Sequence, residues 1–252
     1  MPRYFLEVSY KGTNYSGFQT QKNSNTIQDE IEKAFQVLIK ERIVLTGSSR
    51  TDAGVHALQN FFHFDIGGLD GKQLKEKYVY NLNAILPDDI VVKRIIEVHA
   101  DSHSRFDAVS REYKYYITQK KNPFVKDRAF YFPYTLDIEK MNLVAKEIMK
   151  YEDFTSFSKR NTQVKTFKCD LIQSKWIAEN DLLIYHVKGN RFLRGMVRAL
   201  TATMLRVGRG QISIDEFHSI IKAKDCTRAN FSVPPHGLFL ISVEYPEGYF
   251  GL

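Results

Sequence analysis

Residues 47–58 read Gly-Ser-Ser-Arg-Thr-Asp-Ala-Gly-Val-His-Ala-Leu and separate two apolar runs of the chain. Ile43 to Leu45 precede this stretch, and the aromatic-rich run Phe61 to Phe64 follows it. Small and polar residues between two strand-like runs predict a loop, and loops on rigid scaffolds often carry function. The loop holds one carboxylate, Asp52, and one guanidinium, Arg50. From residue types alone, an ordinary connection in which these two pair or face water is the simpler interpretation.

The composition describes a globular protein with a basic surface. The chain has 252 residues, of which 43% are hydrophobic and 26% charged, and this size suits one large domain or two ordinary ones. Its net charge of +7 favours a polyanionic partner, although charge alone does not distinguish nucleic acid from a membrane surface or an acidic protein. The two cysteines, Cys169 and Cys226, lack metal-type spacing and argue against a disulfide framework. With no apolar run near the roughly 20 residues of a membrane span, we expect a soluble, cytoplasmic protein.

The first half of the chain predicts a β-α-β unit followed by α-β. Alternation from Tyr4 to Tyr10 indicates a strand with one buried face. Thr26 is a candidate N-cap for the helix that follows. The remaining elements expected here are a strand from Phe61 to Ile66, a helix through Leu74, Tyr78 and Leu82, and a strand from Ile90 to Val98.

The second half again mixes strands with helices. The expected elements are a strand over Arg111 to Ile117, a helix capped by Asp137, paired strands Ser174 to Ile177 and Leu182 to Val187 around an Asn180-Asp181 turn, a helix from about Phe192 to Val207 closed by Gly208, a helix with a Ser213/Glu216 capping box, and a last strand from Phe239 to Tyr245. The sequence therefore predicts an α+β fold of two mixed α/β subdomains with largely antiparallel sheets. We place them at 1–105 and 106–252, around a central basic cleft.

Two further groups of residues suit a nucleic-acid surface. Arg111, Tyr113 and Tyr115 alternate on one face of their strand, although a tyrosine there is more simply a core residue. Arg191, Arg194 and Arg198 are spaced three and four residues apart, which on the expected helix would make one basic stripe. A solvated basic face explains that spacing equally well.

The complete strings carry more information than these residue types. Residues 50–57, Arg-Thr-Asp-Ala-Gly-Val-His-Ala, match at all eight positions the signature loop of the tRNA pseudouridine synthase A (TruA) family, which the chain closely resembles. Arg111-Glu112-Tyr113 resembles the Arg-x-Tyr segment of that family. The run from Phe192 to Arg198 resembles its Phe-Leu-x-x-Met-Val-Arg segment, and the opening turn Tyr10 to Gln19 also has a counterpart. The resemblance covers nearly the whole chain.

The resemblance implies isomerisation of uridine to pseudouridine in the anticodon arm of tRNA by a homodimer, without cofactor or metal. It implies that Asp52 is the catalytic carboxylate, that Tyr113 stacks on the target uracil, and that Arg198 pairs with Asp52. An opposite charge would keep Asp52 ionised and would orient it. The target base must leave its stack, so base flipping is expected. The residues expected to contact the substrate, besides Tyr113, are Arg50, Thr51, His56, Arg111, Arg191 and Arg194.

The chain departs from the family pattern at several positions outside the three expected catalytic residues. These positions are Lys11 for aspartate, Phe18 for tryptophan, Ser48-Ser49 for Ala-Gly, Gly195 for a polar residue and Ala202 for glycine. They affect details of RNA contact rather than the reaction.

Two other functions fit parts of the sequence. A non-catalytic RNA-binding module would need the basic and aromatic residues but not Asp52. A nucleoside or base hydrolase would release free uracil, yet a glycosidase normally uses two carboxyl groups and this loop supplies one. Replacing Asp52 by asparagine distinguishes the enzyme from the binding module.

Overall fold

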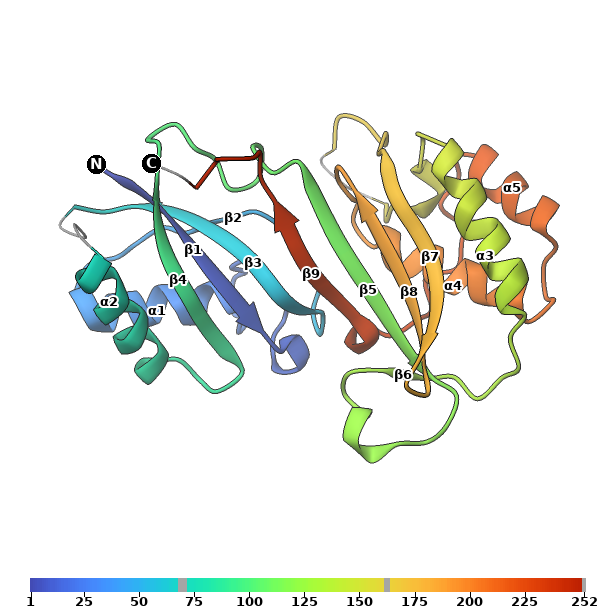
Figure 1. Cartoon of the computed structure of the whole chain (residues 1–252), viewed down its shortest axis with the longest axis horizontal. Helices are drawn as coiled ribbons and strands as arrows, with labels where there is room; N and C mark the ends of the chain where they lie inside the picture. Colours follow the sequence, from blue (N-terminus) through green and yellow to red (C-terminus); the bar gives the residue numbers. More distant parts are fainter. Residues whose placement is uncertain (68–71, 161–163, 251–252) are drawn as a thin grey trace. The chain divides into compact units, whose positions relative to one another are not determined.

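The computed structural model describes residues 1–67, 72–160 and 164–250, and the chain forms two α/β units (Figure 1). The first unit contains Met1–Val109 together with Leu240–Leu252, and the second contains Ser110–Phe239. The sequence placed the boundary four residues earlier and assigned everything from 106 to 252 to the second subdomain. In the structure, the C-terminal segment belongs to the first unit instead.

The first unit is built on an antiparallel sheet with β1 between β3 and β4. Its elements are β1 (Arg3–Tyr10), a 3-10 turn η1 (Gly12–Asn14), α1 (Ile27–Ile39), β2 (Thr46–Gly47), β3 (His56–Asp65), α2 (Lys72–Ile85) and β4 (Ile90–Val98). Tyr4 pairs with Phe64, which puts both on the face that the helices cover. Phe35 of α1 packs 5.1 Å from Phe64, and Lys75 of α2 lies 5.4 Å over the Tyr4 ring. The predicted β-α-β and α-β order is confirmed.

The predicted start of α1 is also confirmed. The Thr26 hydroxyl accepts a hydrogen bond from the Asp29 backbone N–H at 3.2 Å and donates to the Asp29 carboxylate at 2.7 Å. Thr26 therefore satisfies one of the N–H groups that a helix leaves unpaired at its first turn. The carboxylate of Asp29 also complements the positive end of the helix dipole.

The C-terminal segment belongs to the first unit because it covers the face of the sheet opposite the helices. β9 (Leu238–Glu244) lies beside β3, and its Glu244 carbonyl accepts from the Val109 N–H at 2.8 Å. Beyond β9, Tyr245 and Phe250 contact the rings of Phe5 and Phe61 at centroid distances of 5.3–5.9 Å, and their own rings lie 5.2 Å apart. Burial of these aromatic rings outweighs the sequence position of the segment.

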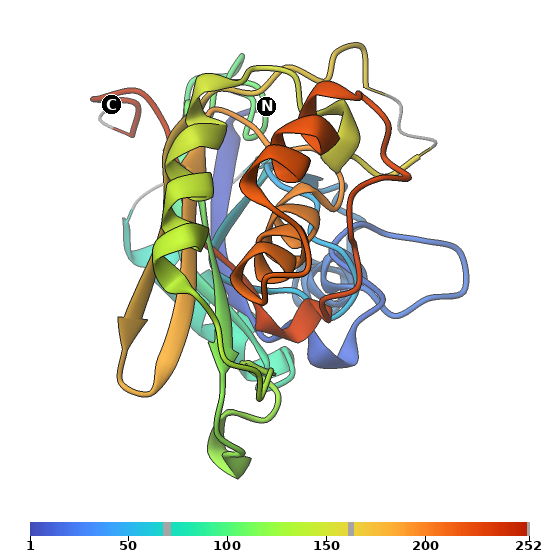
Figure 2. The same cartoon turned by 90° about the vertical axis from the view of Figure 1, so that its right-hand side faces the viewer.

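The second unit has the strand order β5-β8-β7, in which both pairs are antiparallel, and the short strand β6 pairs parallel with β5. Its elements are β5 (Ser110–Thr118), η2 (Pro123–Val125), β6 (Phe130–Tyr131), α3 (Ile138–Glu147), η3 (Ile148–Lys150), η4 (Thr155–Phe157), β7 (Leu171–Glu179), β8 (Leu182–Gly189), α4 (Met196–Gly208), α5 (Ile214–Lys222) and η5 (Pro235–Gly237). Figure 2 shows α3, α4 and α5 gathered against this sheet. Trp176 stacks on Tyr185 at 5.0 Å and donates to Met204 of α4 at 3.2 Å. The Asn180-Asp181 turn and the Ser213/Glu216 capping box are confirmed.

Helix α4 differs from its prediction at both ends. It begins at Met196, not near Phe192, because Gly195 adopts φ +75° at the N-cap and the Arg194 carbonyl accepts from the Lys159 N–H at 2.9 Å. Gly208 is the last helical residue, and Gly210, with φ +67°, takes the left-handed position instead. A β-carbon at Gly208 would stand 2.4 Å from Met141 Sδ, so close packing on α3 explains that glycine. The predicted stripe of three arginines is therefore wrong, since only Arg198 lies on the helix.

Among the described residues, no helix combines the length and the apolar character that crossing a membrane requires.

His63 links the segment before β5 to the first sheet. Its Nδ1 accepts from the Ser104 N–H at 3.2 Å, and the Ser104 hydroxyl donates to the Thr46 carbonyl at 2.9 Å. Burial, together with the neighbouring charges of His103 and Arg3, lowers the pKa of His63 to about 4, against the opposing effect of Asp65 and Asp107. The folded protein therefore holds this imidazole neutral.

We expect stability to fall as the pH drops from about 6.5 towards 4, because the unfolded chain binds a proton that the folded chain excludes. His63 should contribute about 2 kcal/mol of this loss at pH 5. In His63→Gln the difference in unfolding free energy between pH 7.5 and pH 5 should shrink by that amount, measured by urea denaturation with circular dichroism. His99→Gln, at a side chain 74% exposed, is the control and should leave the pH dependence unchanged. An unaltered pH dependence in His63→Gln would contradict this assignment.

Candidate active site

A buried network of hydrogen bonds around Asn60 holds the loop of residues 47–58. Asn60 of β3 has no exposed surface, and its amide donates to the Ser49 carbonyl and to the Tyr10 hydroxyl, each at 3.1 Å. Its carbonyl oxygen accepts from the Ser48 hydroxyl at 2.7 Å. The Tyr10 hydroxyl lies 2.9 Å from that of Thr51. Because unpaired buried polar groups are costly, this network fixes the backbone on both sides of Arg50.

The turn that follows β1 holds the loop from the other side. The Phe18 N–H donates to the Thr51 carbonyl at 3.1 Å, and the Gly12 N–H donates to His56 Nδ1 at the same distance. A β-carbon at Gly12 would stand 2.0 Å from the Val55 carbonyl oxygen, so only glycine permits this approach. The resemblance of the Tyr10–Gln19 stretch to the family therefore has a physical basis, since this turn packs directly on the signature loop.

The two charged side chains of the loop are more exposed than the side chains of Thr51 and His56. Asp52 is half-buried and Arg50 is exposed, whereas Thr51 is 8% exposed and His56 only 1%. Asp52 also anchors the turn, because its carbonyl accepts from the Val55 N–H at 3.2 Å. Thr51 and His56 thus support the loop in this structure, and their expected contact with substrate stays a prediction. Of the four predicted site residues in this loop, Arg50 and Asp52 are the two that are not buried.

Tyr113 and Arg111 lie on the helix-facing side of β5 in the second unit. Tyr113 is 9% exposed, and its ring meets Phe192 edge-on at 5.1 Å. The Arg111 guanidinium donates to the Asn190 carbonyl at 3.0 Å, and the Asn190 amide in turn donates to the Asp170 carboxylate at 2.7 Å. Arg111 therefore fixes the segment that leads from β8 towards α4, and this is the segment that carries Phe192.

Arg198 is oriented by the chain that precedes β9. Its Nε and Nη2 both donate to the Val233 carbonyl, at 3.0 and 2.7 Å. The next carbonyl, that of Pro234, accepts from the Tyr115 hydroxyl at 2.7 Å. Burial raises the pKa of Tyr115, so its hydroxyl remains a donor. Two donors on one carbonyl fix the plane of the guanidinium.

The remaining predicted residues are distributed as follows. Asp52, Arg50, Thr51 and His56 belong to the first unit, and Arg111, Tyr113, Arg191, Arg194 and Arg198 to the second. Within the second unit, Arg191 and Arg194 lie in the segment before α4, where Arg191 is half-buried and Arg194 exposed.

Sequence reasoning missed the residues that hold the site. Asn60 was detectable, because it shares the helix-covered face of β3 with Phe62 and Phe64 and is the polar member of that set. A buried amide on an apolar face requires partners. The Val233 carbonyl had no sequence signal, since any residue supplies one.

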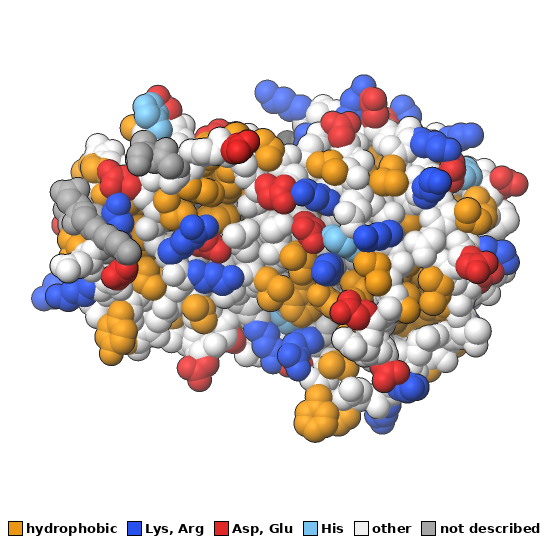
Figure 3. Space-filling model, in the orientation of Figure 1, with side chains coloured by type: hydrophobic (Ala, Val, Ile, Leu, Met, Phe, Trp, Pro, Cys, Tyr) orange, Lys and Arg blue, Asp and Glu red, His pale blue; other side chains and the backbone are white. Residues whose placement is uncertain are grey.

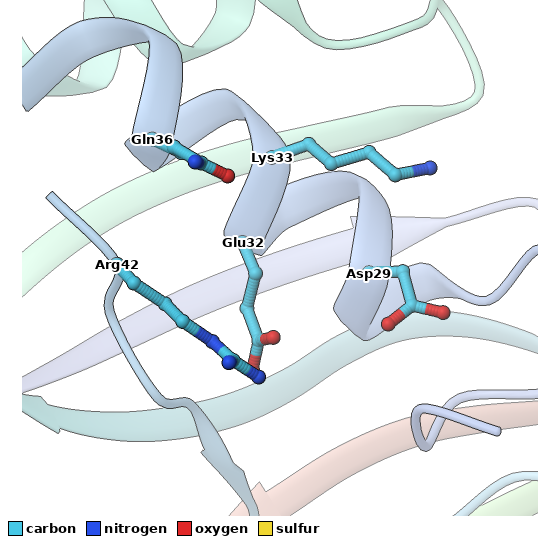
Figure 4. Close-up of a pocket in the computed structure, with 5 residues that line it drawn as sticks. All are labelled: Asp29, Glu32, Lys33, Gln36 and Arg42. Carbon is cyan, nitrogen blue, oxygen red and sulfur yellow. The ribbon is translucent and has the colours of Figure 1, made fainter. Parts of the chain in front are cut away.

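No group of three or more His, Cys, Asp or Glu side chains within residues 1–67, 72–160 and 164–250 is placed to hold a metal ion. One shallow hollow lies on the outer side of α1, lined by Asp29, Glu32, Lys33, Gln36 and Arg42 (Figure 4). It contains none of the candidate site residues.

Comparison with known proteins identifies the class to which these features belong. The family model described as tRNA pseudouridine synthase matches residues 7–107 and 150–246, which include Asp52 and Arg198. The chain belongs to this family, whose members are isomerases acting on uridine in tRNA.

Three relatives of nearly equal length all carry the name tRNA pseudouridine synthase A. The chain is 46% identical to tRNA pseudouridine synthase A of Parabacteroides distasonis over 99% of its own length and 98% of that protein. It is 43% identical to tRNA pseudouridine synthase A of Bacteroides fragilis, over 98% of both chains. It is 36% identical to the protein of the same name from Staphylococcus aureus, over 97% of this chain and 91% of that one.

Removal of the buried amide tests whether it holds the loop. Asn60→Leu should lower the free energy of unfolding by about 2–4 kcal/mol, because the Ser49 carbonyl and the Ser48 and Tyr10 hydroxyls lose their partner in the interior. Urea denaturation measures the loss, and amide hydrogen exchange at Gly54 and Val55 should accelerate more than exchange in β4. Leu58→Ala, on the same strand but 48% exposed, should cost no more than about 0.5 kcal/mol. Equal costs for the two variants would disprove the role of Asn60.

Proposed function

We propose that this protein isomerises uridine to pseudouridine in the anticodon arm of tRNA, with Asp52 as the essential carboxylate. The observation that carries the proposal is the partial exposure of Asp52 in a rigidly held loop. It is the reachable carboxylate of a loop whose flanking residues are fixed by buried hydrogen bonds, within a chain that belongs to the tRNA pseudouridine synthase family. We further propose that the enzyme is cytoplasmic and acts as a homodimer.

The reaction requires little from the protein beyond one well-placed carboxylate. The N1–C1′ glycosidic bond breaks, the uracil turns, and C5 bonds to C1′. The proton on C5 is lost and N1 gains one, so every non-hydrogen atom of the base is retained and no water is added across the glycosidic bond. Asp52 either traps or stabilises the sugar at C1′, or assists the removal of the C5 proton. A hydrolase would need a second carboxyl group to activate water.

The other predicted residues have separable roles in this proposal. Arg50, exposed beside Asp52, would hold the flipped conformation of the target nucleotide. Tyr113 would stack on the uracil. Arg198 would pair with Asp52 and keep it charged and aligned, as the matched motif positions indicate. The orientation of Arg198 by the Val233 carbonyl supports this role, because a fixed guanidinium is pre-organised for a carboxylate.

Asp52→Asn should abolish pseudouridine formation, with a loss of rate on the order of 10³-fold or more, because the amide is neutral and neither nucleophile nor base. Tritium release from tRNA transcripts that carry 5-tritiated uridine measures the reaction directly. Asp88→Asn, at an exposed carboxylate after Pro87, is the matched control and should remain fully active.

The same experiment distinguishes the alternatives. Activity that survives in Asp52→Asn removes Asp52 from catalysis. If the native protein binds tRNA but releases no tritium, the non-catalytic RNA-binding module is the better description. If free uracil accumulates, the protein is a hydrolase.

Two substitutions at Tyr113 test stacking. Tyr113→Phe should leave KM within about twofold because the aromatic ring remains, whereas Tyr113→Leu should raise KM by about 5- to 100-fold, since stacking of a base on an aromatic ring contributes about 1–3 kcal/mol. Any fall of kcat in Tyr113→Phe measures what the hydroxyl adds to C5 deprotonation. Circular dichroism checks that both proteins are folded, because Tyr113 packs on Phe192. Equal KM values for the two variants would exclude a stacking role.

A further inference from the structure

Residues 119–134, which connect β5 to α3 and which we call the η2 segment, combine aromatic and basic side chains. The segment contains five aromatic residues, Phe124, Phe130, Tyr131, Phe132 and Tyr134, and four cations, Lys120, Lys121, Lys126 and Arg128, against the single carboxylate of Asp127. It lies between the two stretches that the family model matches. The roles proposed for Asp52, Tyr113 and Arg198 do not involve it.

The tip of the segment is an ordered turn that exposes a phenylalanine. The Asn122 side chain accepts from the Phe124 N–H at 2.9 Å, Pro123 occupies the first position of η2, and Arg128 donates to the Phe124 carbonyl. Phe124 nevertheless remains 81% exposed. A single exposed apolar side chain is ordinary on protein surfaces. Here, by contrast, hydrogen bonds to both backbone groups of Phe124 hold its exposed ring in place.

The base of the segment is fixed as firmly as its tip. Gln119 donates to the Tyr134 carbonyl at 2.6 Å, and the Phe132 N–H donates to the Thr118 carbonyl at 2.8 Å. The Arg209 guanidinium lies 3.8 Å over the Tyr134 ring. The exposed ring and its cations are therefore carried on a braced projection, and little conformational entropy would be lost when a ligand binds there.

The charges around Phe124 favour one kind of ligand. Lys121, Lys126 and Arg128 are all exposed, and Figure 3 shows hydrophobic side chains at the outer end of this segment with Lys and Arg side chains beside them. Exposed aromatic rings flanked by cations are typical of surfaces that bind single-stranded nucleic acid, where rings stack on bases and cations hold phosphates.

We propose that the η2 segment is a second tRNA contact, in which Phe124 stacks on an unpaired base and Lys121 and Lys126 bind the adjacent phosphates. This inference rests on the proposed function for the identity of the RNA. Five residues of β5 separate Tyr113 from Thr118, a rise of about 17 Å, so the base on Phe124 is not the reacting uridine. The contact positions the tRNA and takes no part in the chemistry.

The test compares variants in steady-state kinetics on a full-length tRNA transcript. Phe124→Ala should raise KM about tenfold with kcat and the thermal midpoint unchanged, and Phe124→Trp should restore KM. Lys121→Ala combined with Lys126→Ala should lower the slope of log KM against log salt concentration by about two. Tyr80→Ala removes an aromatic ring of similar exposure, 74%, from α2 and should have no effect.

Two outcomes would overturn the inference. A KM within twofold of native in Phe124→Ala would show that the ring meets no base. A change in molar mass of Phe124→Ala by light scattering would show that the segment contacts another copy of the chain instead. Filter binding of the same transcript keeps this test separate from the proposed reaction, because tRNA affinity is measurable even if the native protein forms no pseudouridine.

Discussion

Asn60 lies fully buried beneath the loop that carries Asp52, and both polar ends of its side chain are occupied by groups of that loop or of Tyr10. A β-bulge makes this possible. Val8 pairs with Asn60, but Tyr10 pairs with Ala57, so the register shifts between them. The shift re-aims Tyr10 and brings its hydroxyl within reach of both Asn60 and Thr51. The position of Asp52, the proposed catalytic carboxylate, therefore depends on a register irregularity in the pairing of β1 with β3.

In the second unit, too, hydrogen bonds orient the candidate side chains, but the partners are backbone carbonyls. Backbone carbonyls orient two of its arginines: the carbonyl of Asn190 holds Arg111, and that of Val233 holds Arg198. Both carbonyls belong to irregular segments between elements, which bend to present an acceptor where a strand or helix would have used it internally. In each unit, the candidate site residues lie on regular elements or short loops, and hydrogen bonds from neighbouring segments fix their direction.

The sequence predicted the elements well where a local signal exists. Caps at Thr26, Asp137 and Ser213 and the strand Ile90–Val98 depend on neighbours within a few residues, and the structure confirms all of them. The start of α4 could not be predicted, because it depends on a hydrogen bond between Lys159 and Arg194, distant in sequence.

In the candidate site, too, local sequence motifs were predictable and contacts between distant residues were not. Asp52 and Tyr113 were identified from matched motifs, yet the residues that hold them are tertiary partners. The return of the C-terminal segment to the first unit likewise depends on rings of Phe5 and Phe61 that lie far upstream. Periodicity assigns such rings to a core face but does not specify which segment covers them.

The two serines before Arg50 show how a departure from a family pattern has opposite effects at adjacent positions. Where the family pattern has Ala-Gly, Ser48 donates to Asn60 and strengthens the network beneath the loop. Ser49 contributes its carbonyl to that network, and its buried hydroxyl has no hydrogen-bond partner among the residues that the structure describes. Burial of an unpaired hydroxyl costs about 1–3 kcal/mol, whereas one hydrogen bond contributes about 0.5–1.5 kcal/mol net. The loop therefore uses the backbone of Ser49, and the hydrogen bond of Ser48 offsets part of the cost of the Ser49 side chain.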